Sequence, residues 1–430
     1  MRLLHTSDWH VGKAIRGRSR SAEHQAVLAE IAGIAESQSV DLVVVAGDLF
    51  DTATPTAESE RIVYRALLDL AAGGRPVVVV AGNHDSAQRL AAVAPLSEAS
   101  GIHVAAAIRP PTDGGVLELD VDGETALLAL LPFPSQRYVV TADLLLSGDA
   151  ADAHAAYADR VVRILGALTA GFRADTVNLV VAHLMVMGGV MGGGERGAHT
   201  VFDYWVPATA FPAAAQYVAL GHLHRPQTVA GPAPLHYCGS PLQLDFGESA
   251  NDPVVHVVDV RPGLPAQVRA VPLTAGRRLR TLRGPLADVL ARAAEAGDDH
   301  LRVVLDERAR VGLADEVRAA APHVVEVALA PRDDDEGERR RVADPDRLRR
   351  TPRDLLAEYL EAQDALDERV LRLFDELVEA DEAAGSGSGS TEPGEPGGPD
   401  GSGGAVGVGG PAGSGAAVAA AGAGVGEGAR

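Results

Sequence analysis

The sequence predicts an α/β protein with a layered domain over residues 1–273 and a second, smaller α/β domain over residues 278–330. Two observations carry this prediction. Short β-branched runs alternate with amphipathic segments from residue 1 to about residue 270, as in layered sheet proteins, and the alternation recurs on a smaller scale after residue 278. A chain of 430 residues, 46% of them hydrophobic, can also fill more than one core.

In the larger domain, the strands are predicted from apolar runs rich in β-branched residues. They are Arg2 to Thr6, Leu42 to Ala46, Val77 to Ala81, Ala126 to Leu131, Val177 to Ala182, Tyr217 to Leu220 and Val254 to Val260. Apolar residues also recur at helical spacing from His24 to Ile34 and from Ile62 to Leu70, which predicts two helices that cover the sheet.

The smaller domain repeats strand and helix patterns in alternation, as a small α/β unit does. The predicted order is strand Leu279 to Leu282, helix Leu286 to Ala294, strand Leu301 to Leu305, helix Leu313 to Ala320 and strand Val324 to Leu329.

Three further segments follow the two domains. Residues 331–350 are predicted to be a charged linker, and residues 351–384 an acidic C-terminal helix, because Thr351 can cap it and Pro352 suits its first turn. The apolar side of this helix packs either on its own domain or on a partner protein. Residues 385–430 contain almost no large apolar side chain, so we expect a disordered, flexible tail.

Charge and cysteine content restrict the function. Of the net charge of −21, residues 351–400 carry −11 and residues 1–250 carry −10, and the latter include acids considered below as metal ligands. The negative charge therefore weakens the prediction of a nucleic-acid partner without excluding one. Cys238 is the single cysteine, so no intramolecular disulfide can form. Since we also find no signal peptide and no apolar run of membrane-spanning length, we expect a cytoplasmic protein without a membrane contact.

Polar residues that can bind metals follow five of the predicted strands, where open α/β sheets build their binding sites. Each motif alone is more often a loop or a structural histidine. All five in order, each directly after a hydrophobic strand, are not expected by chance, and they predict seven metal ligands. These are Asp8, His10, Asp48, Asn83, His183, His222 and His224.

Seven ligands of this kind suit a phosphoesterase with two divalent metal ions. A phosphodiester is anionic, so its hydrolysis needs concentrated positive charge, which two ions about 3.5–4 Å apart provide. Only a carboxylate bridges two cations compactly, and Asp48, on a turn preceded by a glycine, is the candidate. Mixed imidazole and carboxylate ligation disfavours magnesium and favours manganese, with iron or zinc as alternatives.

His84 is predicted to be a catalytic residue that binds no metal. It lies next to Asn83 and before Asp85, whose carboxylate we expect to orient the ring. Its role would be that of a general acid for the leaving oxygen or of a transition-state stabiliser.

With these motifs in this order, the sequence resembles the calcineurin-like metallophosphoesterase superfamily. The resemblance implies a two-sheet α/β sandwich with both ions at the strand ends. It assigns to one ion Asp8, His10, Asp48 and His224, and to the other Asp48, Asn83, His183 and His222. The protein phosphatase branch usually has Asp-Arg-Gly after its second motif, and the run from Gly47 to Asp51 departs from this.

The flanking stretches resemble a narrower group, the SbcD nuclease subunits of bacterial SbcCD complexes. They are Thr6 to Lys13, Ala46 to Asp51, Ala219 to Arg225 and Tyr237 to Glu248, of which the last is the most specific. This resemblance covers roughly residues 1–375 and stops at the tail.

That family implies a manganese-dependent DNA nuclease, an exonuclease on double strands and an endonuclease on hairpins and single strands. It would work with the SbcC ATPase, a coiled-coil protein of the SMC type, in DNA end processing, repair and recombination at the nucleoid. The resemblance also implies a homodimer through the phosphoesterase domain within a heterotetramer. The small domain would cap the DNA, and the region 351–384 would bind the SbcC coiled coil.

For contact with DNA phosphates, the sequence offers a basic loop after the first motif and one arginine after the last. These residues are Lys13, Arg16, Arg18, Arg20 and Arg225. The alternative is a solvated loop that happens to be basic. Two other functions also remain open: a small-molecule or protein phosphatase, which would share every metal ligand, and a non-catalytic scaffold for an ATPase, which the complete ligand set disfavours.

Overall fold

The computed structural model describes residues 1–121, 123–135, 157–194, 205–330, 356–357, 360–361 and 367–374. The chain divides into two compact units, residues 1–331 and residues 332–430.

Two six-stranded sheets dominate the first unit and confirm the predicted two-sheet α/β fold. Their strand orders are β16-β15-β1-β4-β5-β6 and β13-β14-β12-β9-β8-β7. The first sheet contains β1 (Arg2–Thr6), β4 (Leu42–Val45), β5 (Val77–Val80), β6 (Ile102–Ala105), β15 (Val254–Arg261) and β16 (Leu264–Pro272). The second contains β7 (Val116–Val121), β8 (Glu124–Leu131), β9 (Val177–His183), β12 (Tyr217–Gly221), β13 (Gln227–Val229) and β14 (Leu235–Tyr237). All seven strands predicted for this domain are present, within two residues at each end.

One of the hydrophobic cores lies between the two sheets. Leu3 and Val44 of the first sheet belong to the same buried cluster as Leu128, Leu179 and Ala219 of the second. Since the outer faces are also covered, the central strands are buried on both sides, which is why they read as continuous apolar runs.

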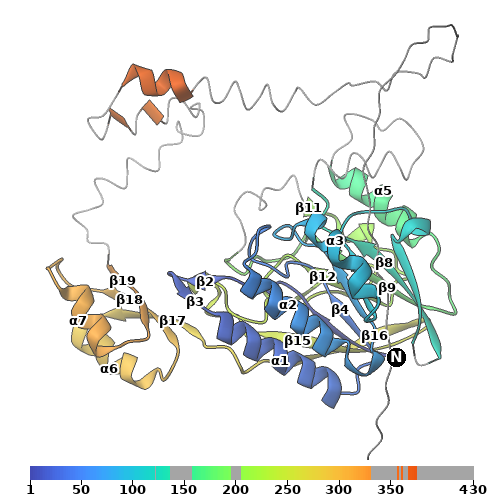
Figure 1. Ribbon diagram of the computed structural model, residues 1–430, viewed down its shortest axis with the longest axis horizontal. Helices are drawn as coiled ribbons and strands as arrows, with labels where there is room; N and C mark the ends of the chain where they lie inside the picture. Colours follow the sequence, from blue (N-terminus) through green and yellow to red (C-terminus); the bar gives the residue numbers. More distant parts are fainter. Residues whose placement is uncertain are drawn as a thin grey trace, which may run out of the picture. The chain divides into compact units, whose positions relative to one another are not determined.

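Helices cover the outer faces, and Figure 1 shows α1 (Ser21–Ser37) and α2 (Ala57–Leu70) side by side over the first sheet. Both match the predicted helices, and their buried apolar residues form a cluster with that sheet. The helix α3 (Ala87–Glu98) packs beside β6, and α5 (Tyr157–Thr169) packs on the second sheet.

The strand directions bring several loops together. The strands β1, β4, β5 and β6 are mutually parallel, as are β8, β9, β12 and β14. The predicted polar motifs all follow the carboxyl ends of these parallel strands, where neighbouring loops converge.

A third sheet, of three parallel strands, follows in the chain and confirms the predicted small α/β unit. Its elements are β17 (Leu279–Gly284), α6 (Leu286–Glu295), β18 (His300–Leu305), α7 (Leu313–Ala320) and β19 (Val324–Leu329). It has its own apolar cluster, in which Val289 and Val317 of the helices pack with Val303 of the sheet.

Short elements complete the first unit. They are β2 (Ala14–Ile15), β3 (Arg18–Ser19), β10 (Met185–Val186), β11 (Trp205–Val206), η1 (Ala72–Gly74), η2 (Pro111–Asp113), η5 (Ala208–Ala210) and η6 (Phe246–Glu248).

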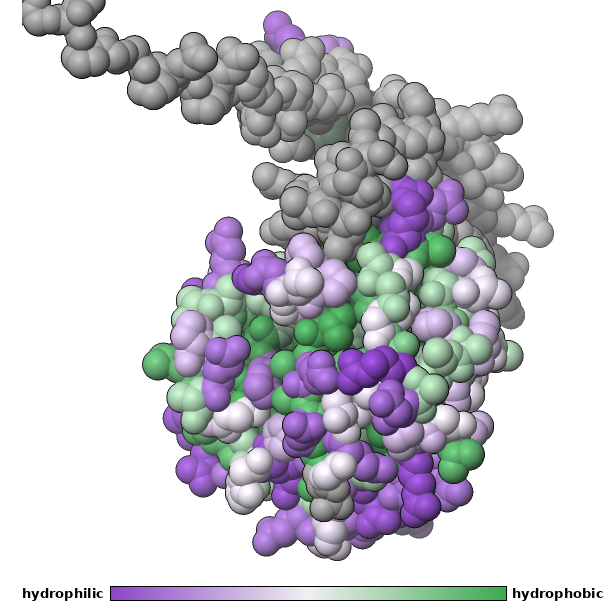
Figure 2. Space-filling model, turned by 90° about the vertical axis from the view of Figure 1, so that its right-hand side faces the viewer, coloured by the Kyte–Doolittle hydropathy of each residue, from purple (hydrophilic) through white to green (hydrophobic). Residues whose placement is uncertain are grey.

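In the face drawn in Figure 2, apolar side chains gather toward the middle and hydrophilic ones dominate the lower part.

The second unit is described only in part. The predicted linker 331–350 and the predicted tail 385–430 lie outside the described residues. Within the predicted helix 351–384, Asp367 is not helical, and its carboxylate accepts a hydrogen bond from the Arg369 amide at 2.8 Å. An aspartate that accepts amide hydrogens in this way starts a helix, so the region is not one continuous helix as predicted. In the parts of the chain that are described, no helix has the length and apolar character that crossing a membrane requires.

Candidate dinuclear metal site

The seven predicted ligands lie together at the carboxyl ends of five strands from both sheets. Asp8 and His10 follow β1, Asp48 follows β4 and Asn83 follows β5. His183 ends β9, and His222 and His224 follow β12. Six of these side chains are buried, and Asn83 is partly exposed.

The backbone at this edge adopts conformations that are uncommon for residues other than glycine. Asp8, His10, Asp48 and His222 have φ values of 53°, 47°, 53° and 97°. Left-handed conformations at non-glycine residues store strain and gather at functional sites, because the surrounding structure has to hold them in place. Four of the seven predicted ligands share this property.

Close approach between loops explains two glycines of the motifs. A side chain at Gly47 would collide with the His183 ring, and one at Gly82 would collide with the Asp48 carboxylate. Backbone hydrogen bonds then lock the first two loops together, from Asp8 N to Gly47 O at 2.9 Å and from His10 N to Asp48 O at 3.0 Å. The glycines therefore allow ligands from different strands to converge.

Three of the ligands form one group of potential metal-binding atoms: Asp8, His10 and His224. All three side chains are buried. The Asp8 carboxylate is held by the Ser7 hydroxyl at 2.5 Å and by the His222 amide at 3.0 Å. The family resemblance assigns these three residues, together with Asp48, to one ion.

The other ligands converge around Asn83. Its Oδ1 atom lies 2.9 Å from His183 Nε2 and 2.7 Å from His222 Nδ1, and the two imidazole nitrogens are 3.3 Å apart. One amide oxygen and two imidazole nitrogens that converge in this way can serve as ligands of one cation.

Asp48 lies between the two groups. Its Oδ2 atom is 3.4 Å from His10 Nε2 and 3.4 Å from His183 Nε2, so a single oxygen is equally near a ligand of each group. The other oxygen accepts the His84 amide at 2.8 Å, which fixes the carboxylate. This geometry favours Asp48 as the bridging ligand.

Neighbouring acceptors fix the protonation of two ligand rings. His183 Nδ1 lies 2.7 Å from the Ala46 carbonyl, and His224 Nδ1 lies 2.7 Å from the Glu248 carboxylate. Because both partners only accept, each Nδ1 carries a hydrogen, and when the ring is neutral its lone pair is on Nε2. Metal-binding histidines typically have such a partner on the opposite nitrogen.

Burial and mutual repulsion perturb the carboxyl groups. Burial raises the pKa of Asp8 to about 6. Burial and the negative charge of Asp48 raise the pKa of Asp85 to about 7. Burial also acts to raise the pKa of Asp48, but the surrounding histidines lower it by more. The pKa of Asp48 therefore lies well below its usual range. Burial lowers the pKa of His183, yet the carboxylates of Asp48 and Asp8 outweigh this and raise it to about 9.

The donor set fits metal ions. His10 is buried, and burial lowers its pKa to about 4, so its ring is neutral at physiological pH and its nitrogens can act as ligands. A buried carboxylate is costly to ionise on its own. Its ionised form becomes favourable beside a cation, which is the largest local charge in such a site. The mixture of carboxylate, amide and imidazole atoms suits manganese, iron or zinc better than magnesium.

His84 lies beside the cluster, with its ring 4.5 Å from the His10 ring. Its Nδ1 atom lies 2.7 Å from the Asp51 carbonyl oxygen, so Nδ1 carries a hydrogen. The orienting role predicted for Asp85 therefore belongs to a backbone group. The Asp85 carboxylate instead accepts backbone amides of the two neighbouring loops, at 2.9 Å from Gly82 and 3.1 Å from Phe50. His10, Asp48 and His84 also form a group that could hold a cation, so proximity alone does not separate His84 from the ligands.

The arginines of the predicted DNA-binding loop are paired with groups of the same chain. Arg20 is buried and pairs with Glu23 at 2.8 Å, so its prediction as a phosphate contact is wrong. Arg16 pairs with Glu326 of β19 at 2.6 Å, and Arg18 donates to the carbonyl oxygen of Pro322 at 2.8 Å.

The remaining two basic residues are nearer the ligands. Lys13 lies 3.3 Å from the Asp51 carboxylate, which is itself 3.6 Å from His10 Nδ1. Arg225 is exposed directly after His224. These two remain candidates for contact with phosphate.

Four residues with a place in this site were not predicted from the sequence. Glu248 orients the ring of His224, and the Asp51 carbonyl orients the ring of His84. Ser7 donates a hydrogen bond to Asp8, and Phe133 stacks on His222 with 5.8 Å between the ring centroids. The first three lie inside the stretches that carry the family resemblance, which was the available signal. Phe133 stands outside every motif.

Known families and individual proteins resemble this chain over most of its described length. Residues 1–168 match the model of the calcineurin-like phosphoesterase family, and residues 275–364 match the model described as Type 5 capsule protein repressor C-terminal domain. The SbcD subunit of the SbcCD nuclease from Bacillus subtilis (strain 168) is 39% identical over 286 residues, which are 65% of this chain and 71% of that protein. The proteins of the same name from Rhodobacter capsulatus and Escherichia coli (strain K12) are 36% and 33% identical over 313 and 310 residues. These cover 68% of this chain in both cases, and 75% and 73% of the two relatives. The chain therefore belongs to the SbcD family of nuclease subunits.

Proposed function

We propose that this protein is a manganese-dependent DNA nuclease that hydrolyses phosphodiester bonds at its dinuclear centre. The observation that carries the proposal is the position of Asp48, whose Oδ2 atom is 3.4 Å from a histidine of each ligand group. A pair of cations at this centre would supply a water of lowered pKa and would offset the negative charge of the phosphate. The choice of a nucleic-acid substrate rests on the relatives, which are named as parts of the SbcCD nuclease.

The proposed ligands are Asp8, His10, Asp48 and His224 for one ion and Asp48, Asn83, His183 and His222 for the other. Two observations support this division: Asn83 Oδ1 meets the imidazole nitrogens of His183 and His222, and Asp8 forms a group with His10 and His224. Asp8 also forms a group with Asp48 and His183, as expected where two metal sites adjoin.

His84 is proposed to act on the substrate itself. The Asp51 carbonyl accepts a hydrogen bond from Nδ1, which orients the ring. In the doubly protonated form of the ring, Nε2 is then the atom that can give a proton to the leaving oxygen or donate to a phosphate oxygen. His84 is only 8% exposed, and its ring lies edge-on to the His10 ring, so a phosphate at the cluster would be within its reach.

The proposed partner is an SbcC-type ATPase of the SMC class, because the relatives are parts of the SbcCD complex. We assign its binding to the region after residue 350, in which Val370 and Leu373 are exposed apolar residues. The small domain, residues 278–330, is proposed to cap bound DNA.

A homodimer within a heterotetramer is the proposed assembly. Leu68 of α2 and Leu96 of α3 are large apolar residues with 48% and 77% exposure, and they line one depression of about 200 Å³. Exposed apolar residues that gather on two helices are typical of a protein interface. The substitution Leu96→Glu should convert a dimer to a monomer in light-scattering measurements, and an unchanged mass would contradict this interface.

A nuclease assay tests the activity. Linear duplex and hairpin DNA are incubated with the protein and manganese, with and without SbcC and ATP, beside the Asp48→Ala variant. Cleavage by the wild type and loss of more than about 100-fold in the variant are expected, since removal of a charge-stabilising group costs this order in turnover. Hydrolysis of p-nitrophenyl phosphate but of neither DNA would indicate a phosphatase instead.

A further inference from the structure

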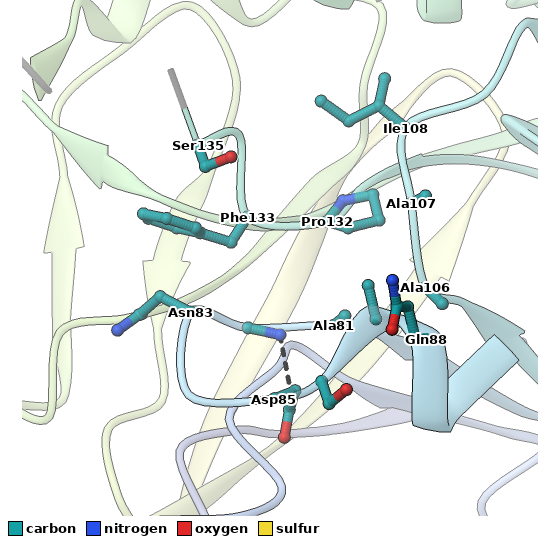
Figure 3. A pocket seen from close by; sticks show the side chains of 13 residues that line it. Ala81, Asn83, Asp85, Gln88, Ala106, Ala107, Ile108, Pro132, Phe133 and Ser135 are labelled. Carbon is teal, nitrogen blue, oxygen red and sulfur yellow. Dashed lines mark hydrogen bonds between the residues drawn. The ribbon is translucent and has the colours of Figure 1, made fainter. Parts of the chain in front are cut away.

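A cavity of about 420 Å³ lies directly beside the metal-ligand cluster. Asn83 belongs to both, because its side chain lines the cavity while its Oδ1 atom meets His183 and His222. Figure 3 shows Asn83 on one wall with Phe133 above it, and Pro132 and Ile108 farther along the same cavity. Any group joined to a phosphate at the cluster therefore has this cavity as a neighbour.

Phe133 provides a rigid aromatic surface at the boundary. Its ring stacks on the His222 ring at an interplanar angle of 22° and lies edge-on to His183 at 6.2 Å. Its backbone amide donates to the Ala81 carbonyl at 2.9 Å, and Ala81 is held in turn by Ala105 of β6 at 3.0 Å. The ring is partly exposed and lines the cavity, so it can also contact a ligand.

The rest of the lining is small and mainly apolar. Its apolar part consists of Ala81, Gly82, Ala87, Ala106, Ala107, Ile108 and Pro132, and Ser86, Gln88 and Ser135 add polar groups. Among the described residues that line the cavity, Asp85 is the one ionisable side chain, and its oxygens accept backbone amides. An apolar cavity of this size with a few polar groups suits a flat organic ring with polar edges, and its described lining residues offer no cationic side chain to a phosphate group.

We propose that this cavity receives one unpaired nucleobase of the DNA strand whose phosphate lies at the metal cluster. The inference rests on the proposed nuclease function and adds to it a requirement on the substrate. A base within a duplex has both faces covered and its polar edge paired, so only a base at a frayed end, in a hairpin loop or in a single strand can enter. Stacking on an aromatic ring tolerates every base, which fits a site with no means of reading sequence.

An abasic residue provides the test. A single-stranded oligonucleotide with one abasic position is compared with the same oligonucleotide carrying all its bases, with manganese, and cleavage is mapped position by position. Stacking of one base on an aromatic residue contributes about 1–3 kcal/mol, so wild-type cleavage at the abasic position should fall about 5- to 100-fold. Equal cleavage at the natural and abasic positions would overturn the proposal.

Two variants connect this effect to the cavity. Ala107→Trp places a large side chain at a lining residue that is not a predicted metal ligand, and Phe133→Ala removes the aromatic wall. In both variants, the ratio of natural to abasic cleavage should approach one. The matched control is Ala26→Trp at an exposed position of α1, which should keep the wild-type ratio. If both cavity variants retain the wild-type ratio, the base binds elsewhere and the proposal is wrong.

Binding gives a readout that does not depend on turnover. Hydrolysis-resistant phosphorothioate oligonucleotides, with and without the abasic residue, are titrated with the wild type and with Ala107→Trp while fluorescence anisotropy is followed. The wild type should prefer the natural oligonucleotide several-fold, and Ala107→Trp should bind both equally. Failure of the wild type to cleave any DNA with manganese would refute the nuclease function, whereas cleavage and binding that ignore the missing base would refute the cavity alone.

Discussion

The contact between Glu248 and His224 yields the sharpest prediction for metal binding. Both side chains are buried, and one Glu248 oxygen lies 2.7 Å from His224 Nδ1 while the other accepts the Leu244 amide at 2.7 Å. The carboxylate therefore satisfies two donors at once. Its position keeps the hydrogen of the ring on Nδ1 and the lone pair on Nε2, toward the metal.

The substitution Glu248→Gln removes one of these interactions in either orientation of the amide. With its oxygen toward His224, the amide nitrogen faces the Leu244 amide, and a buried donor without an acceptor costs about 1–3 kcal/mol of folding stability. With its nitrogen toward His224, the ring is driven to the tautomer whose hydrogen occupies Nε2. Loss of such an orienting partner typically lowers metal affinity about 10- to 100-fold, equivalent to about 1.4–2.7 kcal/mol.

Manganese titration by calorimetry, together with the metal content after desalting, measures this effect directly. The matched control is Glu36→Gln, which removes the same charge at an exposed position of α1. We expect weaker manganese binding and a smaller manganese-induced rise in melting temperature for Glu248→Gln alone. If Glu248→Gln binds manganese as tightly as the wild type, Glu248 does not orient His224 and the assignment of the lone pair to Nε2 is wrong.

Three further predictions concern other parts of the chain. His84→Asn should keep both manganese ions and lose at least about 100-fold in turnover, as removal of an acid catalyst does; retained turnover, measured beside metal content, would exclude the role of His84. Glu23 is hydrogen-bonded to His300 at 2.8 Å, and although burial raises its pKa, His300 and Arg20 lower it more, to well below the ordinary value of 4.5. The full stabilisation by this interaction is present above about pH 4.5 and decreases progressively as the pH falls from there toward the lowered pKa of Glu23. Glu23→Gln should therefore lower the melting temperature at neutral pH, and by a smaller amount at pH 3; a difference at pH 3 as large as that at neutral pH would contradict this sign. Truncation after residue 331 should keep manganese-dependent phosphodiesterase activity and abolish SbcC binding, and co-purification of the truncated protein with SbcC would contradict the assignment of the partner region.

Buried, strongly patterned elements could be predicted from the sequence, whereas exposed ones could not. The runs from Val77 to Val80 and from Leu42 to Val45 are fully buried and were predicted directly from their β-branched residues. The strand β16, in contrast, lies at a sheet edge with mostly exposed or half-exposed residues and gives no alternation that could be recognised. The helix α3 buries only Leu90 and contains Pro95, so neither an apolar stripe nor helix propensity identifies it.

The convergence of the seven candidate ligands could be predicted because each lies at or near the end of a strand. Parallel strands bring such ends to one edge regardless of the distance between them in the sequence, so the constellation follows once the strands are known. The orientation of each ring is a different matter. His84 is oriented by a backbone carbonyl, that of Asp51, and a carbonyl group carries no side-chain signal.

The basic loop shows why charge patterns in a sequence predict less than ligand patterns. A surface arginine is available to DNA only if no carboxylate or carbonyl of the same chain has engaged it, and the partner of Arg16 is Glu326, 310 residues away. Lys13 of the same loop faces the other way, toward Asp51 and through it His10. The segment that was expected to hold DNA thus links β19 of the small domain to a metal ligand through a few residues of chain.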